Sequence, residues 1–393
     1  MHPINLFLLF LAFIHPFKSV SSAQPFKTLV APIHKDTKTS LFTLTLKQNY
    51  LLDLSAPLSW IQCPQPHPTV PCTSPQCTQA TSYLSPLCPS PNNTASTHCD
   101  CTISAANPIT KSCFSSQLSY NNITIPSTNG TNPSFNVYFS CANKSLVQSL
   151  PSGTAGIASL SWSPLSFPSQ LGKKFAVCLP AASRGAAFFG DGPYNLPKRD
   201  AAKLLSYTPL IKNPKSPDYY IGVNAISING DAISVGAKSL ALDSSGRGGV
   251  KLSTVLPYTA LRTDVYKAFL KGFEKAVKGL PKASKVKPFE LCIKASSLGY
   301  TLAGLAVPEI DLQMANGKNW TIYGANSVVF VGKDKACLAF VDSGKKAEEA
   351  AVIGSFQMEN YLLQFDLVQA RLGFSSSLLL ARATCGSFNV TSV

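Results

Sequence analysis

The sequence predicts a mostly β protein built from two lobes. Short apolar or alternating segments recur between clusters of Gly, Pro, Asn and Ser, which is typical of strands separated by turns. The chain contains 29 proline and 24 glycine residues, so turns are plentiful. A chain of 393 residues is too long for one compact core, which favours two domains.

The first 23 residues have the features of a secretory signal peptide. The apolar run from Leu6 to Ile14 is too short to cross a bilayer. Ser21-Ser22-Ala23 follows it, with the small residues that a signal peptidase reads, so we expect cleavage after residue 23. A membrane anchor is the alternative, but no later stretch is long and apolar enough to span. We therefore expect a secreted, extracellular protein that is not bound to a membrane.

The cysteine content indicates a disulfide-bonded protein. All 12 cysteines follow the signal segment, and secretion permits six bridges, each worth about 2–4 kcal/mol. They are Cys63, Cys72, Cys77, Cys88, Cys99, Cys101, Cys113, Cys141, Cys178, Cys292, Cys337 and Cys385. The first eight are dense enough to form a framework of their own, whose pairing spacing alone does not determine. Zinc binding is the alternative, but the short spacings between these cysteines do not match those of a zinc finger. We therefore expect no metal and no cofactor.

The expected strands follow from the short apolar runs, and one segment reads as a helix. In order, the strands are expected at 41–46, 137–140, 175–179, 219–228, 327–331, 337–341 and 361–366. Thr263 is a plausible N-cap for a helix whose apolar face includes Val265, Phe269 and Phe273. The opposite face carries lysines, which indicates that this face lies in solvent.

Two segments lack strand patterning. Residues 64–93 are rich in Pro, Ser, Thr and Cys and are expected to form a bridged surface loop. Residues 191–217 are irregular, and strand structure restarts at Tyr219. We therefore expect an N-terminal lobe with a cysteine-rich insert at 24–205 and a C-terminal lobe at 206–393.

The two halves contain a weak internal repeat. In the first half, an apolar strand ends at Asp53, and Gly156 in an apolar segment follows it by 103 positions. In the second half, Gly354 follows a similar apolar pair. Counting back a similar distance reaches Ser253, which also ends an apolar strand. Ser253 is thus the counterpart of Asp53.

The charge and the glycosylation signals indicate the kind of partner. The formal charge of +15 attracts acidic molecules, such as an anionic polysaccharide or an acidic protein, although it also serves solubility. Nucleic acid is not expected for a secreted, disulfide-bonded chain without a block of like charges. Six N-x-S/T acceptors begin at Asn92, Asn122, Asn129, Asn143, Asn319 and Asn389.

Several segments that together cover nearly all of the mature chain carry a family resemblance. They are LLDLSAPLSWIQC, GTAGIASLSWSPLSFPSQL, SYTPL, YYIGVNAISING, GVKLSTVLPYTALRTDVYKAF and AAVIGSFQMENYLLQFDLVQARLGFSSSLLLARATCGSFNVTS. With these segments the chain resembles the plant pepsin-like glycosidase inhibitors, a catalytically degenerate branch of the aspartic proteases. This family includes xylanase inhibitors, xyloglucan-specific endoglucanase inhibitors, basic 7S globulin and conglutin gamma. The resemblance implies a bilobal pepsin-like fold with two β-barrel-like lobes around a cleft. It also implies that Cys178 bridges to Cys385 and Cys292 to Cys337.

An aspartic protease needs two carboxylates about 3 Å apart that share one proton. Each half-site has the order Asp, then Thr or Ser, then Gly. Here Asp53 is followed by Leu54 and Ser55, and the second half-site begins with Ser253 in place of the aspartate. A serine hydroxyl cannot share a dyad proton, so we expect no catalytic residue and no peptidase activity. Asp53 is then most simply a structural hydrogen-bonding residue.

Other candidate catalytic groups fit less well. Asp342-Ser343-Gly344 spells a complete half-site, but it lies only 12 positions before Gly354. Asp243 lies in a Ser/Gly loop, and both aspartates are expected in turns. The tyrosine that covers the cleft in active enzymes is not found between residues 107 and 118. No G-x-S-x-G motif occurs, which disfavours a serine hydrolase. An aspartic protease with an unorthodox dyad is the least favoured alternative.

The resemblance implies that the protein inhibits cell-wall-degrading glycoside hydrolases in the plant apoplast, as a defence. The blocking side chain of such inhibitors precedes the last cysteine, where this chain has Arg382. Because no histidine is present there, we expect the xyloglucan-specific endoglucanase type of target, with xylanase second. A second inhibitory arginine is expected on another loop, but the region from Trp320 to Tyr323 offers none. The alternative is a basic 7S globulin-like storage protein that binds peptides or polysaccharide.

Overall fold

The computed structural model describes residues 28–85, 87–89, 99–182 and 184–390, which leaves the expected signal peptide outside the described part. The first half of the described chain contains β1 (Thr28–Lys35), β2 (Phe42–Thr45), β3 (Asn49–Asp53), β4 (Trp60–Gln62), α1 (Pro75–Ala80), β5 (Thr102–Ala106), β6 (Cys113–Thr124), β7 (Ser134–Ala142), η1 (Lys144–Val147), β8 (Thr154–Ser159), α2 (Phe167–Gln170), β9 (Lys174–Cys178), β10 (Arg184–Gly190), β11 (Asn195–Leu196), β12 (Arg199–Asp200) and η2 (Ala201–Leu204).

The remaining elements begin at Ser206. They are β13 (Ser206–Lys212), β14 (Tyr219–Ile221), β15 (Val223–Ile228), β16 (Asp231–Ala232), α3 (Ala237–Leu240), β17 (Val250–Leu252), β18 (Thr259–Leu261), α4 (Thr263–Ala276), β19 (Lys282–Ala283), β20 (Cys292–Lys294), η3 (Ala295–Ser297), β21 (Tyr300–Thr301), β22 (Gly304–Leu305), β23 (Ile310–Met314), β24 (Asn319–Ile322), α5 (Gly324–Ser327), β25 (Val328–Phe330), β26 (Lys335–Leu338), β27 (Phe340–Asp342), β28 (Ala351–Ile353), α6 (Ser355–Met358), β29 (Leu362–Asp366), β30 (Arg371–Phe374), η4 (Leu378–Ala381) and η5 (Cys385–Ser387).

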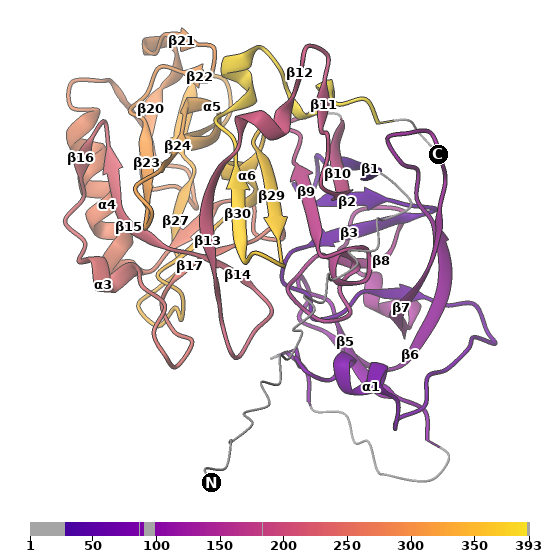
Figure 1. Ribbon diagram of the computed structural model, residues 1–393. Helices are drawn as coiled ribbons and strands as arrows, with labels where there is room; N and C mark the ends of the chain where they lie inside the picture. The colour runs from indigo at the N-terminus through magenta and orange to yellow at the C-terminus, as the bar shows by residue number, and fades with distance from the viewer. Residues whose placement is uncertain (1–27, 86, 90–98, 183, 391–393) are drawn as a thin grey trace, which may run out of the picture.

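One large sheet runs through both halves and confirms the expected mostly β, bilobal pepsin-like class. β9 of the first half pairs antiparallel with β29, and β30 pairs with both β29 and β13. These four strands lie between the two lobes in Figure 1, with β1 to β8 on one side and β15 to β27 on the other. The lobes are therefore joined by continuous backbone hydrogen bonding rather than by a flexible linker.

The same strand arrangement occurs once in each lobe. β3 pairs in parallel with β8, and β4 pairs antiparallel with β8 and in parallel with β7. In the second lobe, β17 pairs in parallel with β28, and β18 pairs antiparallel with β28 and in parallel with β27. The internal repeat expected from the sequence is thus present in the topology, with β3 and β17 as counterparts.

Two glycines lie where the strands of each repeat cross. A Cβ atom on Gly156 would lie 2.0 Å from the carbonyl oxygen of Trp60. A Cβ atom on Gly354 would lie 2.4 Å from the carbonyl carbon of Tyr258. Real Cβ atoms do not approach backbone so closely, so each crossing requires glycine.

Several expected elements are confirmed, and some boundaries differ. The helix α4 begins at Thr263, but its N-cap is Arg262, because the Thr263 hydroxyl donates to Asp342 at 2.7 Å instead of capping. The loop expected at 64–93 contains α1, which Ser74 caps through its side chain. The irregular segment expected at 191–217 contains β13, which is a paired strand despite Pro209. Pairing of β13 with β30 outweighs the unfavourable effect of the proline on strand formation.

All 12 cysteines lie in the described part of the chain and are paired. The two bridges implied by the family resemblance, Cys178–Cys385 and Cys292–Cys337, are both present. The other four are Cys63–Cys141, Cys72–Cys99, Cys77–Cys101 and Cys88–Cys113. These four all link residues of the first lobe, as the density of cysteines there indicates.

The surface carries the expected glycosylation acceptors. Asn122, Asn129, Asn143, Asn319 and Asn389 are all exposed, while Asn92 lies outside the described residues. Their modification stays a prediction. Among the described residues, no helix has the length and apolar character needed to cross a membrane.

The crossing at Gly156 yields a stability prediction. We expect Gly156→Ala to lower the free energy of unfolding by about 1–3 kcal/mol, because the new methyl group must displace the backbone of β4. Gly299→Ala is the matched control, since a Cβ there meets only Ala306 at 3.7 Å and should change stability by less than about 0.5 kcal/mol. Urea denaturation of the oxidised proteins measures both. Equal stability of the two variants would contradict the close approach.

Candidate functional site

The two half-sites of the repeat meet where the lobes join. The Thr254 hydroxyl donates to the Leu52 carbonyl oxygen at 2.8 Å and accepts from the Leu54 backbone N–H at 3.3 Å. These bonds bring together residues some 200 positions apart in the chain. Leu54, the counterpart of Thr254 in the first half-site, has no hydroxyl with which to return the contact.

Asp53 is the single carboxylate contributed by the two half-site triplets, and it is only 2% exposed. Its Oδ1 accepts from the Ser55 backbone N–H at 2.8 Å. Burial raises the pKa of Asp53 to about 6, and the nearby Asp218 carboxylate adds to this effect. Hydrogen bonds from the backbone and the charge of Lys251 act in the opposite direction. The carboxyl group therefore exchanges its proton in mildly acidic conditions.

Ser253 occupies the counterpart position and is 5% exposed. Its backbone N–H donates to the Ile353 carbonyl oxygen at 2.9 Å, which holds the end of β17 against β28. A serine hydroxyl does not ionise in the range where a carboxyl pair shares a proton. The half-site triplets therefore hold one acid, whereas peptide hydrolysis by this fold requires an acid and a base.

A compact ion cluster lies on β17 beside this junction. The Lys251 ammonium lies 2.7 Å from Glu349 and 3.5 Å from Asp218. Burial alone would lower the pKa of Lys251, but the two carboxylates more than offset it and raise that pKa above its ordinary value. Lys251 is thus a fixed positive charge that balances the acids around the junction.

The two other candidate aspartates are hydrogen-bonded in exposed segments. Asp342 Oδ1 accepts from the Thr263 hydroxyl at 2.7 Å and from the Gly344 N–H at 2.8 Å. Asp243 Oδ1 accepts from the Ser245 N–H at 2.8 Å and from the Arg247 N–H at 2.9 Å. Both carboxylates are exposed. Asp243 lies in a turn, as expected, but the expectation of a turn at Asp342 is wrong, because this residue ends β27 and is bonded to α4.

Arg382 lies on the surface, just after η4. Its backbone is left-handed, with φ of 52°, and its N–H donates to the Leu379 carbonyl oxygen at 2.9 Å. Cys385, three residues later, is bridged to Cys178, and its N–H donates to Asn360. The guanidinium makes no ion pair with any residue of the described chain. An exposed cation is therefore presented from a short, tethered segment.

The region around Trp320 is not the surface loop that sequence reasoning took it to be. Trp320 lies on β24, is 1% exposed and stacks on Phe374. The exposed feature nearby in sequence is the hairpin of β21 and β22, whose tip presents Tyr300 and Leu302, 76% and 57% exposed. Two large apolar side chains around a turn, in the segment GYTLAG, are the signal that could have identified this tip.

The hairpin tip is connected to the Arg382 segment through short helices. A Cβ on Gly304 would lie 2.2 Å from the backbone nitrogen of Ala325, so β22 packs directly on α5. Asn326 of α5 donates to the Glu359 carbonyl oxygen after α6, and Asn360 accepts from the Leu378 N–H of η4. In Figure 1, β21, β22 and η4 lie along the same end of the molecule.

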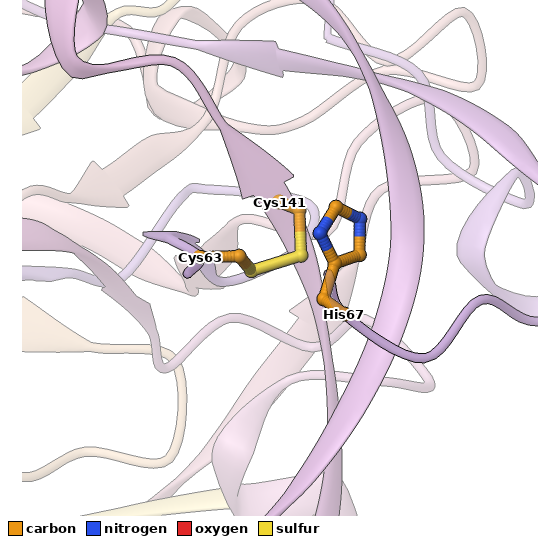
Figure 2. Close-up of side chains that lie close together, drawn as sticks. All are labelled: Cys63, His67 and Cys141. Carbon is orange, nitrogen blue, oxygen red and sulfur yellow. A yellow bond between two sulfur atoms is a disulfide. The ribbon is translucent and has the colours of Figure 1, made fainter. Parts of the chain in front are cut away.

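One cluster has the residue types of a metal site. Figure 2 shows His67 beside Cys63 and Cys141, but a disulfide joins the two sulfur atoms. Bonded sulfurs offer no thiolate, and zinc requires thiolate, imidazole or carboxylate ligands. The neighbouring imidazole nitrogens are buried and have no hydrogen-bond partner in the described part of the chain.

Comparison with known proteins settles the family. Residues 37–191 match the family model described as xylanase inhibitor N-terminal, and residues 218–376 match xylanase inhibitor C-terminal. The chain belongs to the xylanase inhibitor family.

Named relatives cover almost the whole chain. A probable aspartic proteinase GIP2 from Nicotiana benthamiana is 36% identical over 96% of this chain and 94% of its own length. A chitinase CLP from Oryza sativa subsp. japonica is 38% identical over 93% and 92%. The crystal structure of edgp aligns with a TM-score of 0.85 at 32% identity, covering 93% of this chain and 99% of that chain. Basic 7S globulin from soybean aligns with a TM-score of 0.76 at 29% identity, covering 93% and 100%.

The environment of Asp53 yields a prediction about pH. Between about pH 4 and 6, the folded protein holds a proton on Asp53 that the unfolded chain releases, because only the folded pKa is raised. The stabilisation of the folded state by this proton is fully present below pH 4 and is lost as the pH rises through 6. The free energy of unfolding falls by about 2–3 kcal/mol over this range. Asp53→Asn removes this pH dependence, because the variant has no titrating carboxyl group at position 53. We therefore expect the variant to gain stability relative to the native protein by that amount between pH 4 and 7.

Urea unfolding at several pH values measures this difference. Glu359, whose pKa burial raises to about 7, titrates in an overlapping window but is common to both proteins and cancels. Glu359→Gln in both backgrounds is the control for that cancellation. A stability difference that does not change with pH would show that Asp53 has an ordinary pKa.

Proposed function

We propose that this protein is a secreted, catalytically inactive inhibitor of glycoside hydrolases that degrade plant cell walls. The observation that supports it best is the exposed Arg382, which forms no ion pair within the described part of the chain and lies on a segment tethered by a disulfide. The loss of a second half-site carboxylate at Ser253 supports the absence of catalysis. Six disulfides suit an extracellular protein, and we place it in the apoplast.

The chemistry of the target explains why an arginine is effective. Glycoside hydrolases use a pair of Asp or Glu side chains in an open cleft. A guanidinium is permanently charged and its planar fork matches a carboxylate with two parallel hydrogen bonds. Inserted between the two carboxylates, Arg382 would occupy the place of the sugar and bind both catalytic groups. A xyloglucan-specific endo-β-1,4-glucanase is the first expected target, and a xylanase is the second.

The hairpin tip supplies the apolar part of this surface. Tyr300 and Leu302 are exposed at a place from which a partner can bury them, and aromatic anchors carry much of the energy in protein interfaces. Tyr300 lies on β21 and Leu302 in the turn to β22, and this hairpin is linked through α5 and the residues after α6 to η4. In this proposal the apolar tip takes the role that a second arginine on another loop would have.

The names of two relatives raise enzymatic alternatives. Peptide or glycoside hydrolysis at the lobe junction would require a second acid beside Asp53. The counterpart residue is Ser253, and the neighbouring Asp218 is ion-paired with Lys251. The aspartates at 243 and 342 are hydrogen-bonded in exposed segments. Binding without catalysis is therefore the better interpretation of this junction.

The inhibitory role of Arg382 can be tested directly. We expect Arg382→Ala to raise the inhibition constant against a sensitive fungal xyloglucanase by about 30-fold or more, as for a buried interface anchor. Arg184→Ala removes an exposed arginine from β10 and is the matched control, with no expected effect. Leu302→Ala should weaken inhibition less. The inhibition constants come from initial rates across a panel of xyloglucanases and xylanases.

Two results would contradict this assignment. Inhibition that is unchanged by Arg382→Ala removes that residue from the mechanism. No inhibition of any enzyme in the panel, by a protein that is folded and oxidised, removes the inhibitor function itself.

A second function is favoured by the lysines of α4. Lys267 and Lys271 are exposed along one side of this helix, and the exposed Lys278 follows its end. None of the three makes an ion pair with the described residues. Lys267 and Lys271 lie about 6 Å apart along the helix axis, and Lys278 extends this basic row, which suits a linear polyanion. This favours the alternative of a basic 7S globulin-like wall or storage protein that binds acidic polysaccharide.

Retention on immobilised polygalacturonate shows whether these three lysines bind a polyanion as a local array or only through the net charge of the protein. We expect the triple variant Lys267→Gln, Lys271→Gln and Lys278→Gln to elute at clearly lower salt, because a local array of charges is lost. The control variant replaces Lys38, Lys47 and Lys144, which are exposed elsewhere, and has the same net charge. Equal elution of the two variants would show that only net charge matters.

A further inference from the structure

A surface pocket lies between the end of the first lobe and the C-terminal segment. It has a volume of about 310 Å³ and is lined by Arg199, Leu204, Ser376, Ser377, Leu380 and Ala381. Arg199 and Leu204 come from β12 and η2, and the other four lie in or just before η4. This volume is at the small end of the range for ligand sites, so a single-ring molecule would fit.

The guanidinium of Arg199 is available in this pocket. Arg199 is exposed and makes no ion pair with any described residue. The adjacent Asp200 does not neutralise it, because its Oδ1 accepts from the backbone N–H groups of Tyr194 and Ala202, each at 2.9 Å. The pocket therefore offers a planar cation that matches a carboxylate.

The hydroxyl of Ser377 is the second polar group of interest. Ser377 is 2% exposed, and its hydroxyl has no hydrogen-bond partner within the described chain. It stands at the N-cap of η4, where a serine normally bonds the backbone, yet it makes no such bond. Leaving a buried hydroxyl unpaired costs about 1–3 kcal/mol, which a bound donor or acceptor would recover.

The other residues that line the pocket determine which class of ligand fits. Leu204, Leu380 and Ala381 are apolar, and Ser376 is the one polar residue of the lining besides Arg199 and Ser377. A sugar would bring several hydroxyls that this pocket could not pair, which is unfavourable. An apolar ring with one carboxylate and one hydroxyl would match the lining instead.

We propose that this pocket binds small hydroxylated aromatic carboxylates. The carboxylate bonds the guanidinium of Arg199, the ring packs between Leu204 and Leu380, and the ring hydroxyl bonds Ser377. This binding function goes beyond hydrolase inhibition and requires no hydrolase. Its test is therefore independent of the test of the inhibitor function.

The test is a calorimetric titration of the full secreted protein with 4-hydroxybenzoate. We expect saturable binding of one molecule per chain, with at least tenfold weaker binding of its methyl ester and of glucuronate. Arg199→Gln should weaken binding about tenfold or more, through loss of a charge-assisted bond. Arg247→Gln removes an exposed arginine from a distant turn and should bind as the native protein does.

Ser377→Ala separates a binding role from a structural one. Without ligand, this variant should be as stable as the native protein or more stable, because its hydroxyl is unpaired. It should nevertheless bind 4-hydroxybenzoate no better than it binds benzoate. Absence of saturable binding, binding unaffected by Arg199→Gln, or a preference for glucuronate would each overturn the proposal.

Discussion

The hydroxyl of Thr254 bonds the backbone on both sides of Asp53, and the arrangement of the two lobes depends on this contact. It links the end of β17 to the end of β3 through Leu52 and Leu54. The glycines Gly156 and Gly354 let β8 and β28, the parallel partners of β3 and β17, approach β4 and the start of β18 closely. The junction is thus built like that of an active two-carboxylate enzyme, while one of its carboxylates is missing.

Much of this junction follows from the sequence, because its constraints are local and repeated. The spacing from Asp53 to Gly156 recurs from Ser253 to Gly354, since each lobe repeats one strand crossing. The exposed turn at Asp243 was also predictable from its Ser and Gly neighbours, whereas Asp342 ends β27. The disulfide pairing in the first lobe was not predictable from the sequence, because it depends on how β4, β5 and β6 pack together. β13 and β24 were missed because long-range pairing and the burial of Trp320 outweigh their local composition.

With one acid in the two half-site triplets, the chemically available groups lie at the rim. Arg382, the hairpin tip at Tyr300 and Leu302, and the lysines of α4 are exposed and free to contact a partner. The Cys178–Cys385 bridge holds the Arg382 segment on the lobe-joining strand β9. We propose that the rim supported by these strands is a binding surface, which agrees with membership of the xylanase inhibitor family.

The most direct test of this account is a peptidase assay on the purified, oxidised protein. Denatured protein substrate is incubated between pH 3 and 6 with and without pepstatin, alongside the Asp53→Asn variant. The account predicts no turnover above background in any sample, because a single carboxyl group cannot act as both acid and base. Turnover that pepstatin inhibits and that Asp53→Asn abolishes would contradict it.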